Sequence, residues 1–334
     1  MQVIPVDAHD DATFARWYAV HAAGASAGRV DPPIWTRAES QVRYRESGPD
    51  AAQLREAYAA VDGAGTVLGA GHLEAPLRDN PRYALLGVDV PPGHRGRGVG
   101  AAVYARLAER AVELGRTVLG AELHQPFDAP EVPGVRFAKR LGFTRRNVEM
   151  RRVLSLPVPR ARLDELAAHA AERTGGYTLR QWRGPCPDEL AEPYAYLKSL
   201  LMTDAPMGDL QYEPEVWDVA RLRAHERQAA DQGRTVLTAV AIAPGGRLAG
   251  HTQIGVPGHE PGVAYQWDTL VLTGHRGHRL GLALKVANLR TLLDEFPDRH
   301  RLTTYNAVQN GPMVAVNDAL GFRPVEYLEE WQRS

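Results

Sequence analysis

The chain has 334 residues, of which 44% are hydrophobic and 24% charged, and its formal net charge is -1. This length predicts two domains of roughly 150 residues each. The balanced charge argues against a disordered chain, a nucleic-acid-binding protein and a protein drawn to anionic membranes. No apolar run approaches the roughly 20 residues that span a bilayer, and the N-terminus shows no signal-peptide pattern. Cys186 is the only cysteine, which excludes an intrachain disulfide. We therefore expect a cytoplasmic protein.

The first half alternates predicted strands with predicted helices. Two of the strands are joined by a glycine turn with good hairpin chemistry. A later strand leads into a glycine- and arginine-rich loop, after which apolar residues recur at helical spacing. The predicted strands are 3–6, 56–61, 66–73, 82–90 and 117–123, and the predicted helices are 11–22 and 99–114.

The two halves of the sequence repeat at a nearly constant offset. The segment GHRGRGVG at 93–100 recurs as GHRGHRLG at 274–281. Upstream, GTVLGAGH at 65–72 lines up with GRLAGHTQ at 246–253 at the same spacing. A Leu-Gly-Phe tripeptide follows each loop in the same order. Three matches in one order indicate a duplicated domain.

Each half therefore predicts the same mixed α/β fold, in which helices flank a mostly antiparallel central sheet. We expect an N-terminal domain over 1–155, a linker with a helix over 156–176 and a C-terminal domain over 177–334. The predicted elements of the second half are strands at 177–182, 235–242, 247–254, 264–272 and 301–305, and helices at 188–201 and 280–293.

The loop after the third main strand carries the clearest chemical signal. Its glycines allow a tight turn that presents consecutive backbone N–H groups, and the helix N-terminus adds the positive end of its dipole. Arg95 and Arg97 add positive charge at the rim. These features predict a site for a pyrophosphate or a similar anion; the alternative is a tight turn with solvated arginines. The loop has neither the ending of a P-loop nor the glycine spacing of a dinucleotide motif.

The pattern Arg95-x-x-Gly98-x-Gly100, placed between a strand and a helix and followed by Leu-Gly-Phe, resembles the coenzyme A motif of the GNAT superfamily of acyl-CoA-dependent N-acyltransferases. The resemblance covers nearly the whole chain apart from the linker, and tandem chains of similar length resemble the actinobacterial mycothiol synthase group. It implies two tandem GNAT-like domains, each with a V-shaped splay in its sheet. It also implies acetyl-CoA as co-substrate and a primary amine of a small molecule as acceptor.

The resemblance further implies which residues bind coenzyme A. In the family, the loop amides hold the pyrophosphate and strand N–H groups hold the acyl carbonyl. The residues at these places in the first half are Val90, Arg95, Gly96, Arg97, Gly98, Val99 and Gly100. Those in the second half are Thr273, His275, Arg276, Gly277, His278, Arg279, Leu280 and Gly281. Asn306 and Asn310 are expected on the pantetheine arm, with helix capping as the alternative for both.

Catalysis is expected in the C-terminal half. When the halves are aligned on their loops, Asp268 stands where the first half has Gly87, inside an apolar strand where an unpaired carboxylate is costly. The family commonly places an acidic residue in this strand. We therefore expect Asp268 to take the amine proton, the Val271 N–H to hold the oxyanion and Tyr305 to return a proton to the thiolate. A structural aspartate at a strand bend is the alternative.

Two departures from the family pattern weigh against this choice. Arg279 stands where the motif has glycine, and Ala138 and Asn317 stand where the family usually has a helix tyrosine. The alternatives are a mycothiol-synthase-like or antibiotic-amine acetyltransferase with catalysis in the N-terminal half, and a non-catalytic acyl-CoA-binding or sensor protein.

The segment 204–219 has no counterpart in the first half, and segments in this place often line the acceptor site in the family. The expected substrate contacts are Met207, Asp209, Tyr212 and Tyr265. No histidine has ligand spacing with a second histidine or a cysteine, so no metal site is expected. We expect no nucleic-acid or membrane partner, and the sequence leaves a monomer and a homodimer open.

Overall fold

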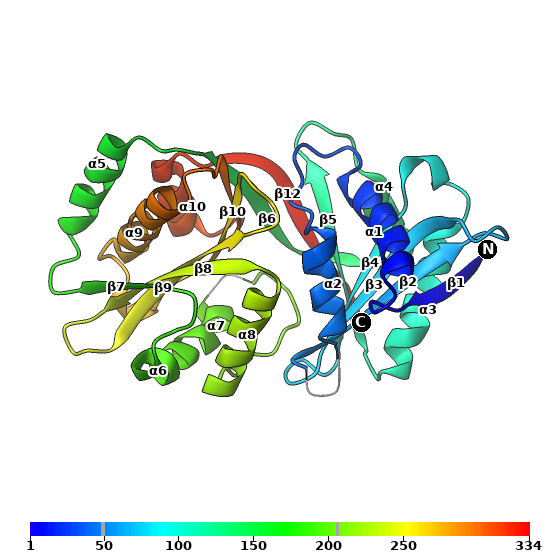
Figure 1. Cartoon of the computed structure of the whole chain (residues 1–334), viewed down its shortest axis with the longest axis horizontal. Helices are drawn as coiled ribbons and strands as arrows, with labels where there is room; N and C mark the ends of the chain where they lie inside the picture. The colour runs from blue at the N-terminus through cyan, green and yellow to red at the C-terminus, as the bar shows by residue number, and fades with distance from the viewer. Residues whose placement is uncertain (48–50, 205–206) are drawn as a thin grey trace. The chain divides into compact units, whose positions relative to one another are not determined.

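The computed structural model describes residues 1–47, 51–204 and 207–334 (Figure 1). Residues 205 and 206 of the expected acceptor segment thus lie outside the described part. The chain forms two compact units, and neither is continuous in sequence. Unit 1 comprises Met1–Asn147, Asp209–Glu213 and Leu328–Ser334, and unit 2 comprises Val148–Gly208 and Pro214–Tyr327. The second half of the sequence therefore supplies two short pieces of unit 1.

Unit 1 is built on a sheet with the strand order β1-β2-β3-β4-β5-β12. The β4–β5 pair is parallel, whereas β1–β2, β2–β3 and β3–β4 are antiparallel. Its strands are β1 (Gln2–Val6), β2 (Gln53–Val61), β3 (Val67–Pro76), β4 (Tyr83–Asp89), β5 (Val118–Pro126) and the end of β12 (Arg323–Arg333). Its helices are α1 (Asp11–Ser26), α2 (Arg37–Arg45), η1 (Pro92–His94), α3 (Val99–Glu113) and α4 (Pro133–Arg140).

Unit 2 repeats this plan with the strand order β6-β11-β10-β9-β8-β7. Again one pair, β10–β11, is parallel. The strands are β6 (Thr144–Ser155), whose first residues belong to unit 1, β7 (Thr178–Arg183), β8 (Arg234–Ile242), β9 (Leu248–Pro257), β10 (Val263–Val271) and β11 (Arg301–Ala307). The helices are α5 (Arg160–Ala171), α6 (Asp188–Ser199), α7 (Leu201–Asp204), α8 (Val219–Asp231), η2 (Thr273–His275), α9 (Leu280–Glu295) and α10 (Gly311–Leu320).

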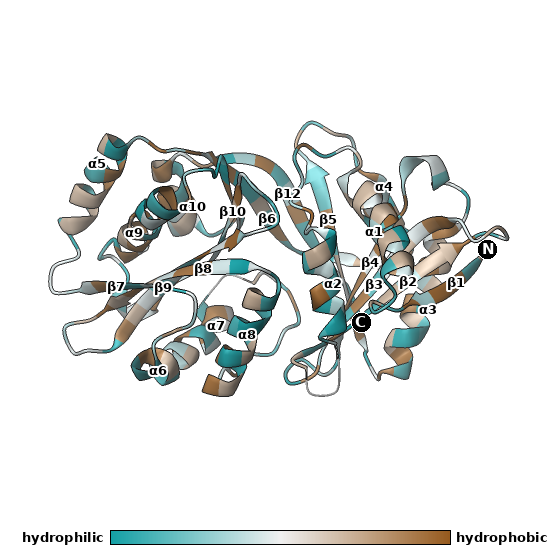
Figure 2. Cartoon of the chain, viewed as in Figure 1, coloured by the Kyte–Doolittle hydropathy of each residue, from teal (hydrophilic) through white to brown (hydrophobic). Residues whose placement is uncertain are grey.

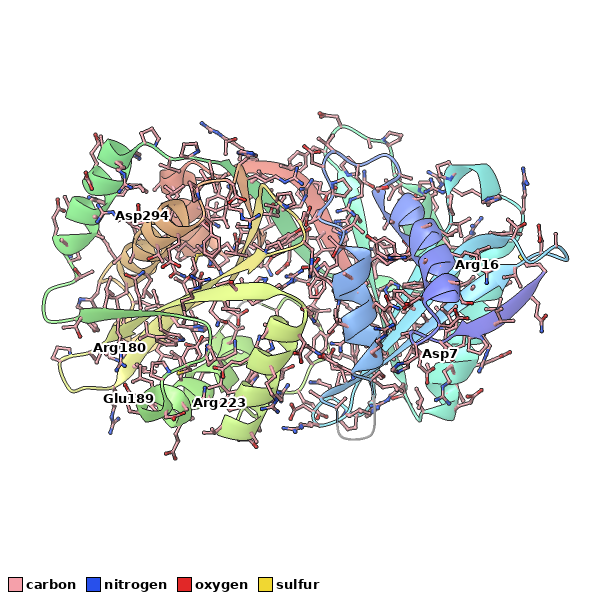
Figure 3. The ribbon with its side chains drawn as sticks, in the orientation of Figure 1. Asp7, Arg16, Arg180, Glu189, Arg223 and Asp294 are labelled. Atoms are coloured by element: carbon pink, nitrogen blue, oxygen red, sulfur yellow. The ribbon has the colours of Figure 1, made fainter. Side chains whose placement is uncertain are left out.

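Helices cover both faces of each sheet. In unit 2, α9 and α10 lie on one side of the strands and α6 to α8 on the other (Figure 1), over separate apolar clusters. Hydrophobic and polar residues share the surface of helices such as α3 (Figure 2). This amphipathic pattern buries one stripe of each helix against its sheet. Charged side chains gather outside, where exposed pairs such as Arg180 and Glu189 add little stability (Figure 3).

Local sequence explains where the helices start and how closely α3 approaches its sheet. The Asp10 side chain accepts the N–H groups of Ala12 and Thr13 at the start of α1. A side chain at Gly71 would place its Cβ 2.5 Å from Cγ1 of Val103. Glycine at this point of β3 thus lets α3 lie directly on the sheet. The N-terminus of α3 is thereby fixed beyond the end of β4.

The predicted fold class is confirmed: the chain has two copies of a mixed α/β unit. The helices α2 and α8 were not predicted, and the predicted helix over 188–201 is α6, with the short α7 after it. Among the described residues, no helix is both long and apolar enough to span a membrane.

Candidate acyl-transfer sites

In both units, the two parallel strands separate after a short paired stretch. β4 and β5 pair from Tyr83–Val118 to Leu85–Gly120, although both strands continue beyond these residues. β10 and β11 likewise pair only from Val263–Arg301 to Tyr265–Thr303. Past these points, backbone groups on the facing edges lack a strand partner and can bind a ligand. Each unit thus contains a V-shaped opening.

The strand leading to the opening is irregular in unit 2 but regular in unit 1. The β10–β9 register shifts between Gln266 and Thr269, which places Asp268 in a β-bulge. In unit 1, Gly87 pairs with His72 in an unbroken register. Bulges redirect side chains and are frequent beside active sites. The asymmetry between Asp268 and Gly87 therefore coincides with a difference in backbone geometry.

The two glycine-rich loops share one backbone conformation. Gly96 and Gly277 both have positive φ, of 75° and 84°. The residue that caps the next helix is also left-handed in each unit: Gly98 has φ 80° and Arg279 has φ 54°. Because a non-glycine residue pays roughly 1–2 kcal/mol in this region, Arg279 keeps the motif's shape under strain. The first turns of α3 and α9 thus present their N–H groups in the same way.

An arginine in each loop folds back onto the preceding strand. Arg95 Nε donates to the Val90 carbonyl oxygen at 2.8 Å, and Arg276 Nε donates to that of Val271 at 3.2 Å. These two bonds are equivalent under the repeat. They tie each loop to the end of its strand, next to the V-shaped opening.

The surroundings of the two loops differ in charge. In unit 2, Arg279 pairs with Glu172 at 2.7 Å, and the Asp204 carboxylate accepts the N–H and hydroxyl of Thr273 at 3.3 Å each. Gly96 and Gly98 in unit 1 and Gly277 in unit 2 all border open space. An incoming anion would therefore meet open glycines at both loops and, at the second loop, two carboxylates that already have partners.

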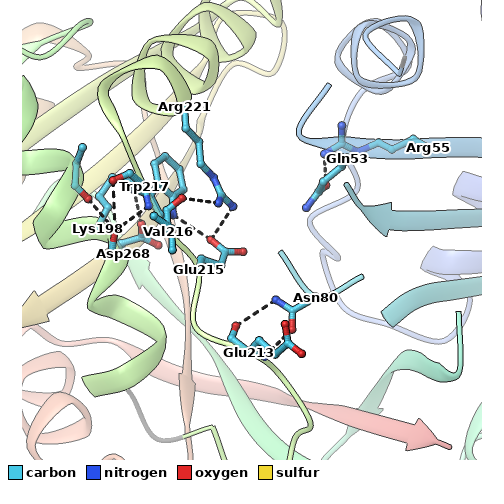
Figure 4. A network of polar contacts seen from close by, with 12 residues as sticks. Gln53, Arg55, Asn80, Lys198, Glu213, Glu215, Val216, Trp217, Arg221 and Asp268 are labelled. Atoms are coloured by element: carbon cyan, nitrogen blue, oxygen red, sulfur yellow. Dashed lines mark hydrogen bonds and ion pairs between the residues drawn. The ribbon is translucent and has the colours of Figure 1, made fainter. Parts of the chain in front are cut away.

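Asp268 is bound in an ion pair. Its carboxylate lies 2.8 Å from Nζ of Lys198, on α6, and 31% of its side chain is exposed (Figure 4). Lys198 is buried, donates to Oε1 of Gln253 at 3.2 Å and lies over the Trp217 ring. Burial raises the pKa of Asp268, but the positive charge of Lys198 outweighs it and holds this pKa at about 2. Asp268 is thus a permanent carboxylate and a weak base at neutral pH.

Two histidines, the buried His251 and the half-buried His225, lie near this pair without adding positive charge. His251 Nδ1 lies 3.2 Å from the Tyr194 hydroxyl, and His225 packs between Trp217 and Trp267. Burial, together with the positive charge of Lys198, lowers the pKa of His251 to about 3 and that of His225 to about 4. Both imidazoles are therefore neutral at physiological pH, which leaves Lys198 and Asp268 as the charged groups of this network.

The predicted asparagines have different partners. The Asn310 side chain accepts the Met313 N–H at 3.3 Å and caps α10. Asn306 accepts a hydrogen bond from Nδ2 of Asn317, whose Oδ1 accepts from Nζ of Lys285 at 2.8 Å. Because Lys285 can only donate, this chain of bonds leaves the Nδ2 group of Asn306 as its remaining donor.

The expected substrate contacts are divided between the two units. Asp209 and Tyr212 belong to unit 1, where the ring of Tyr212 lies 4.6 Å from that of Tyr83. Met207 and Tyr265 belong to unit 2. Tyr265 is buried, and its hydroxyl donates to Glu260 at 2.9 Å. Tyr305 is half-buried on β11, and the Val271 backbone ends β10 beside the opening.

Comparisons with known proteins agree with this geometry. Residues 26–143, within unit 1, match the acetyltransferase (GNAT) family. A solved tandem GNAT protein from the clavulanic acid biosynthesis pathway is 28% identical, with a TM-score of 0.79 over 99% of this chain and 98% of that one. The chain has a tandem GNAT fold. A GCN5-related N-acetyltransferase from Sphaerobacter thermophilus shares this fold at 13% identity, with a TM-score of 0.67 over 99% and 95% of the two chains.

We found no match to this chain among curated proteins. The family match and the solved structures together support an N-acetyltransferase of the GNAT type. Proteins of this family use acetyl-CoA as co-substrate.

The sequence did not predict that Asp268 pairs with Lys198. Composition held one signal, because only three of the 39 basic residues are lysines: Lys139, Lys198 and Lys285. Two of them, Lys198 and Lys285, are buried. Cys186, in contrast, is buried in an apolar cluster, and burial raises the pKa of its thiol to about 12, so it is no nucleophile at neutral pH.

Proposed function

We propose that this protein transfers an acetyl group from acetyl-CoA to a primary amine of a small molecule, with the chemistry in unit 2. The observation that carries this proposal is the bulged Asp268–Lys198 pair beside the V-shaped opening. The solved relative from the clavulanic acid biosynthesis pathway supports a small-molecule acceptor. Unit 1 is proposed to bind acetyl-CoA through Val90 and residues 95–100 without turning it over.

In the proposed reaction, the neutral amine attacks the thioester carbon, the carbon–sulfur bond breaks and the thiolate leaves with a proton. The backbone N–H of Val271 is proposed to stabilise the oxyanion, and residues 276–281 to hold the pyrophosphate through helix N-terminal amides. Asn306, whose free donor is Nδ2, is proposed to bond a carbonyl of the pantetheine arm. Tyr305, on the same strand, is the proposed proton donor to sulfur, and it recovers a proton from the attacking nitrogen once the carbon–nitrogen bond has formed.

The role of Asp268 is refined by its ion pair. A carboxylate with a pKa of about 2 removes a proton from an ammonium group only at a cost of about 1.4 kcal/mol per unit of pKa difference. We therefore propose that Asp268 attracts and orients the ammonium form of the acceptor. The proton then passes to water as the amine enters the opening, and the amine attacks in its neutral form.

Two matched variants test where acetyl-CoA binds and where it reacts. Arg97 and His278 are exposed at equivalent loop positions. Both residues stand directly before the N-cap of a helix, where the helix dipole tolerates a glutamate but the glutamate repels a pyrophosphate. We expect calorimetry with acetyl-CoA to show two sites in the native chain and one in each of Arg97→Glu and His278→Glu.

Thiol release from acetyl-CoA with a panel of small amines then assigns the reaction. We expect His278→Glu to abolish turnover and Arg97→Glu to retain it. Loss of turnover in Arg97→Glu alone would instead place catalysis in unit 1. Binding at both loops without turnover of any amine would favour a non-catalytic acyl-CoA sensor. The weak basicity of Asp268 is consistent with such a protein.

A further inference from the structure

Unit 1 brings together two histidines and one carboxylate that come from three different elements. His21 lies on α1, His72 on β3 and Asp89 at the end of β4. His21 Nδ1 is 2.7 Å from Oδ2 of Asp89, and His72 Nδ1 is 3.9 Å from the same oxygen. One donor atom from each residue lies within 4.8 Å of the other two. We propose that these three residues form a divalent-metal site of the zinc type.

The distances fit a metal ion after small side-chain movements. Zinc binds imidazole nitrogen and carboxylate oxygen at about 2.0–2.2 Å, so tetrahedral ligand atoms lie about 3.4 Å apart. The two measured separations bracket this value. Two imidazoles and one carboxylate are also the donor set that zinc and similar first-row metals favour. An oxygen-only cation such as magnesium is disfavoured by the two nitrogen ligands.

His72 lacks a hydrogen-bond partner at the nitrogen that faces the carboxylate. Its Nδ1 atom is buried and unsatisfied. A buried polar atom without a partner costs about 1–3 kcal/mol. A metal ion bound between this nitrogen and Asp89 would give the Nδ1 atom a partner.

The charge of Asp89 is balanced by no lysine or arginine among the described residues. Its recorded ion-pair partners are the two histidines, and its side chain is 16% exposed. Glu74, on the neighbouring strand, pairs instead with both Arg43 and Arg55. In unit 2 the corresponding face holds Asp268 with Lys198. A cation bound to Asp89 would balance its negative charge, as Lys198 balances that of Asp268 in unit 2.

The surrounding residues hold the two imidazoles in place. The His21 ring stacks on Trp17 with an interplanar angle of 2° and meets the His72 ring edge-on. The His72 ring occupies the space beside Gly87, where an added Cβ would lie 1.8 Å from its Cε1 atom. Gly87 therefore makes room for this ligand. Each histidine side chain is 20% exposed, which leaves a fourth coordination position open to water or to a ligand.

Sequence spacing gives no sign of such a site, because His21 and Asp89 are 68 residues apart and belong to different elements. The site does not depend on the proposed chemistry in unit 2. With three protein ligands and one open position, it matches metal sites that bind or activate a ligand rather than purely structural ones. The ligand class expected at the open position is a small oxygen or nitrogen donor bound to unit 1.

The test is a titration of the full, chelator-treated chain with ZnCl2 by calorimetry, and with CoCl2 by visible absorption. We expect one equivalent to bind and the cobalt form to show the spectrum of a four-coordinate site. His21→Ala, His72→Ala and Asp89→Asn should each weaken binding more than tenfold. His9→Ala, which removes an exposed histidine of the same unit, should leave it unchanged.

Gly87→Ala is a further variant, because it displaces His72 without altering a ligand and should also weaken binding more than tenfold. The proposal is overturned if the native chain binds no zinc at 100 micromolar, an outcome that needs no variant to fold. It is equally overturned if binding persists in all three ligand variants. In either case, the cluster is a hydrogen-bonded pair between His21 and Asp89.

Discussion

Single residues decide the chemistry of each unit, and the buried lysines show how. Lys198 converts Asp268 from a group that would be costly to bury into a stable carboxylate. Lys285 has a different environment, because its described hydrogen-bond partner is the neutral Asn317. Burial alone lowers the pKa of Lys285 to about 7. The two lysines therefore differ in their partners, because Lys198 faces a carboxylate and Lys285 faces a neutral amide.

Removing one member of the Asp268–Lys198 pair should destabilise unit 2 more than removing both. Asp268→Asn leaves Lys198 buried and unpaired, and we expect the free energy of unfolding to fall by about 3–5 kcal/mol. The double variant Asp268→Asn/Lys198→Met removes both charges and should recover most of this loss. Chemical denaturation of the native chain, both single variants and the double variant measures the coupling. Additive losses would show that the pair is not coupled.

The same pair makes the free energy of unfolding depend on pH in the acid range. The pKa of Asp268 is lowered from 3.8 to about 2 in the folded chain. The native state therefore binds this proton less readily than the unfolded state, and the pair's contribution is complete above pH 4 and lost as the pH falls toward 2. Denaturation across this range should show a steeper acid loss in the native chain than in the double variant. Equal slopes would contradict the ion pair.

Lys285 predicts a dependence of the same sign on the alkaline side. Its pKa falls from 10.5 unfolded to about 7 folded, so between these values the unfolded chain holds a proton that the native chain lacks. The free energy of unfolding should rise with pH across this window by up to about 1.4 kcal/mol per pH unit. Lys285→Met should flatten this rise. Lys139→Met, which removes an exposed lysine, is the matched control.

At the scale of elements, the two loop–helix junctions have the same backbone conformation but different capping residues. Gly98 and Arg279 hold equivalent left-handed positions at the starts of α3 and α9. Arg279 is kept in this conformation while its guanidinium bonds Glu172 and the His169 carbonyl, both at or beyond the end of α5. The strain at Arg279 thus accompanies contacts that anchor the α5 end to the second loop.

Exchanging the two capping residues, as Gly98→Arg and Arg279→Gly, separates the effect of backbone strain from the effect of the side-chain contacts. Gly98→Arg introduces a side chain at φ 80° with open space around it, and we expect a loss of about 1–2 kcal/mol in the free energy of unfolding. Arg279→Gly relieves the same strain but loses an exposed ion pair worth about 0–1 kcal/mol, so it should be neutral or stabilising. Thermal and chemical denaturation test both variants. A clear loss in Arg279→Gly would show that the contacts to α5 outweigh the strain.

At the scale of the whole molecule, the sequence predicts the duplicated fold better than it predicts which segments belong to which unit. Loop chemistry, hairpin turns and helical periodicity are local, so the duplicated fold, the two loops and the apolar strand carrying Asp268 could be predicted from the residues alone. The partners could not, because Lys198 and His72 reach their carboxylates through tertiary packing. The expected acceptor segment shows the same limit, since Asp209 and Tyr212 belong to unit 1 although the sequence places them in the second half.

The last seven residues also come from the second half of the sequence and belong to unit 1, and their contribution to that unit can be tested. Leu328–Ser334 belong to unit 1, where β12 is the neighbour of β5 and Trp331 is buried in the same cluster as Tyr58 and Leu73. Trp331→Ala should cost about 3–5 kcal/mol, and this loss should fall on unit 1. Hydrogen exchange should therefore accelerate in β3 and α3, and the acetyl-CoA site that Arg97→Glu removes should weaken.

Trp182→Ala is the matched control, because Trp182 packs against an apolar cluster of unit 2. It should accelerate exchange in β8 and β9 and leave β3 unchanged. If Trp331→Ala instead accelerated exchange equally in β3 and β9, the two units would unfold as one cooperative block. Selective loss in unit 1 would show that a strand at the end of the chain stabilises the unit at its beginning, so that neither sequence half folds with a complete sheet by itself.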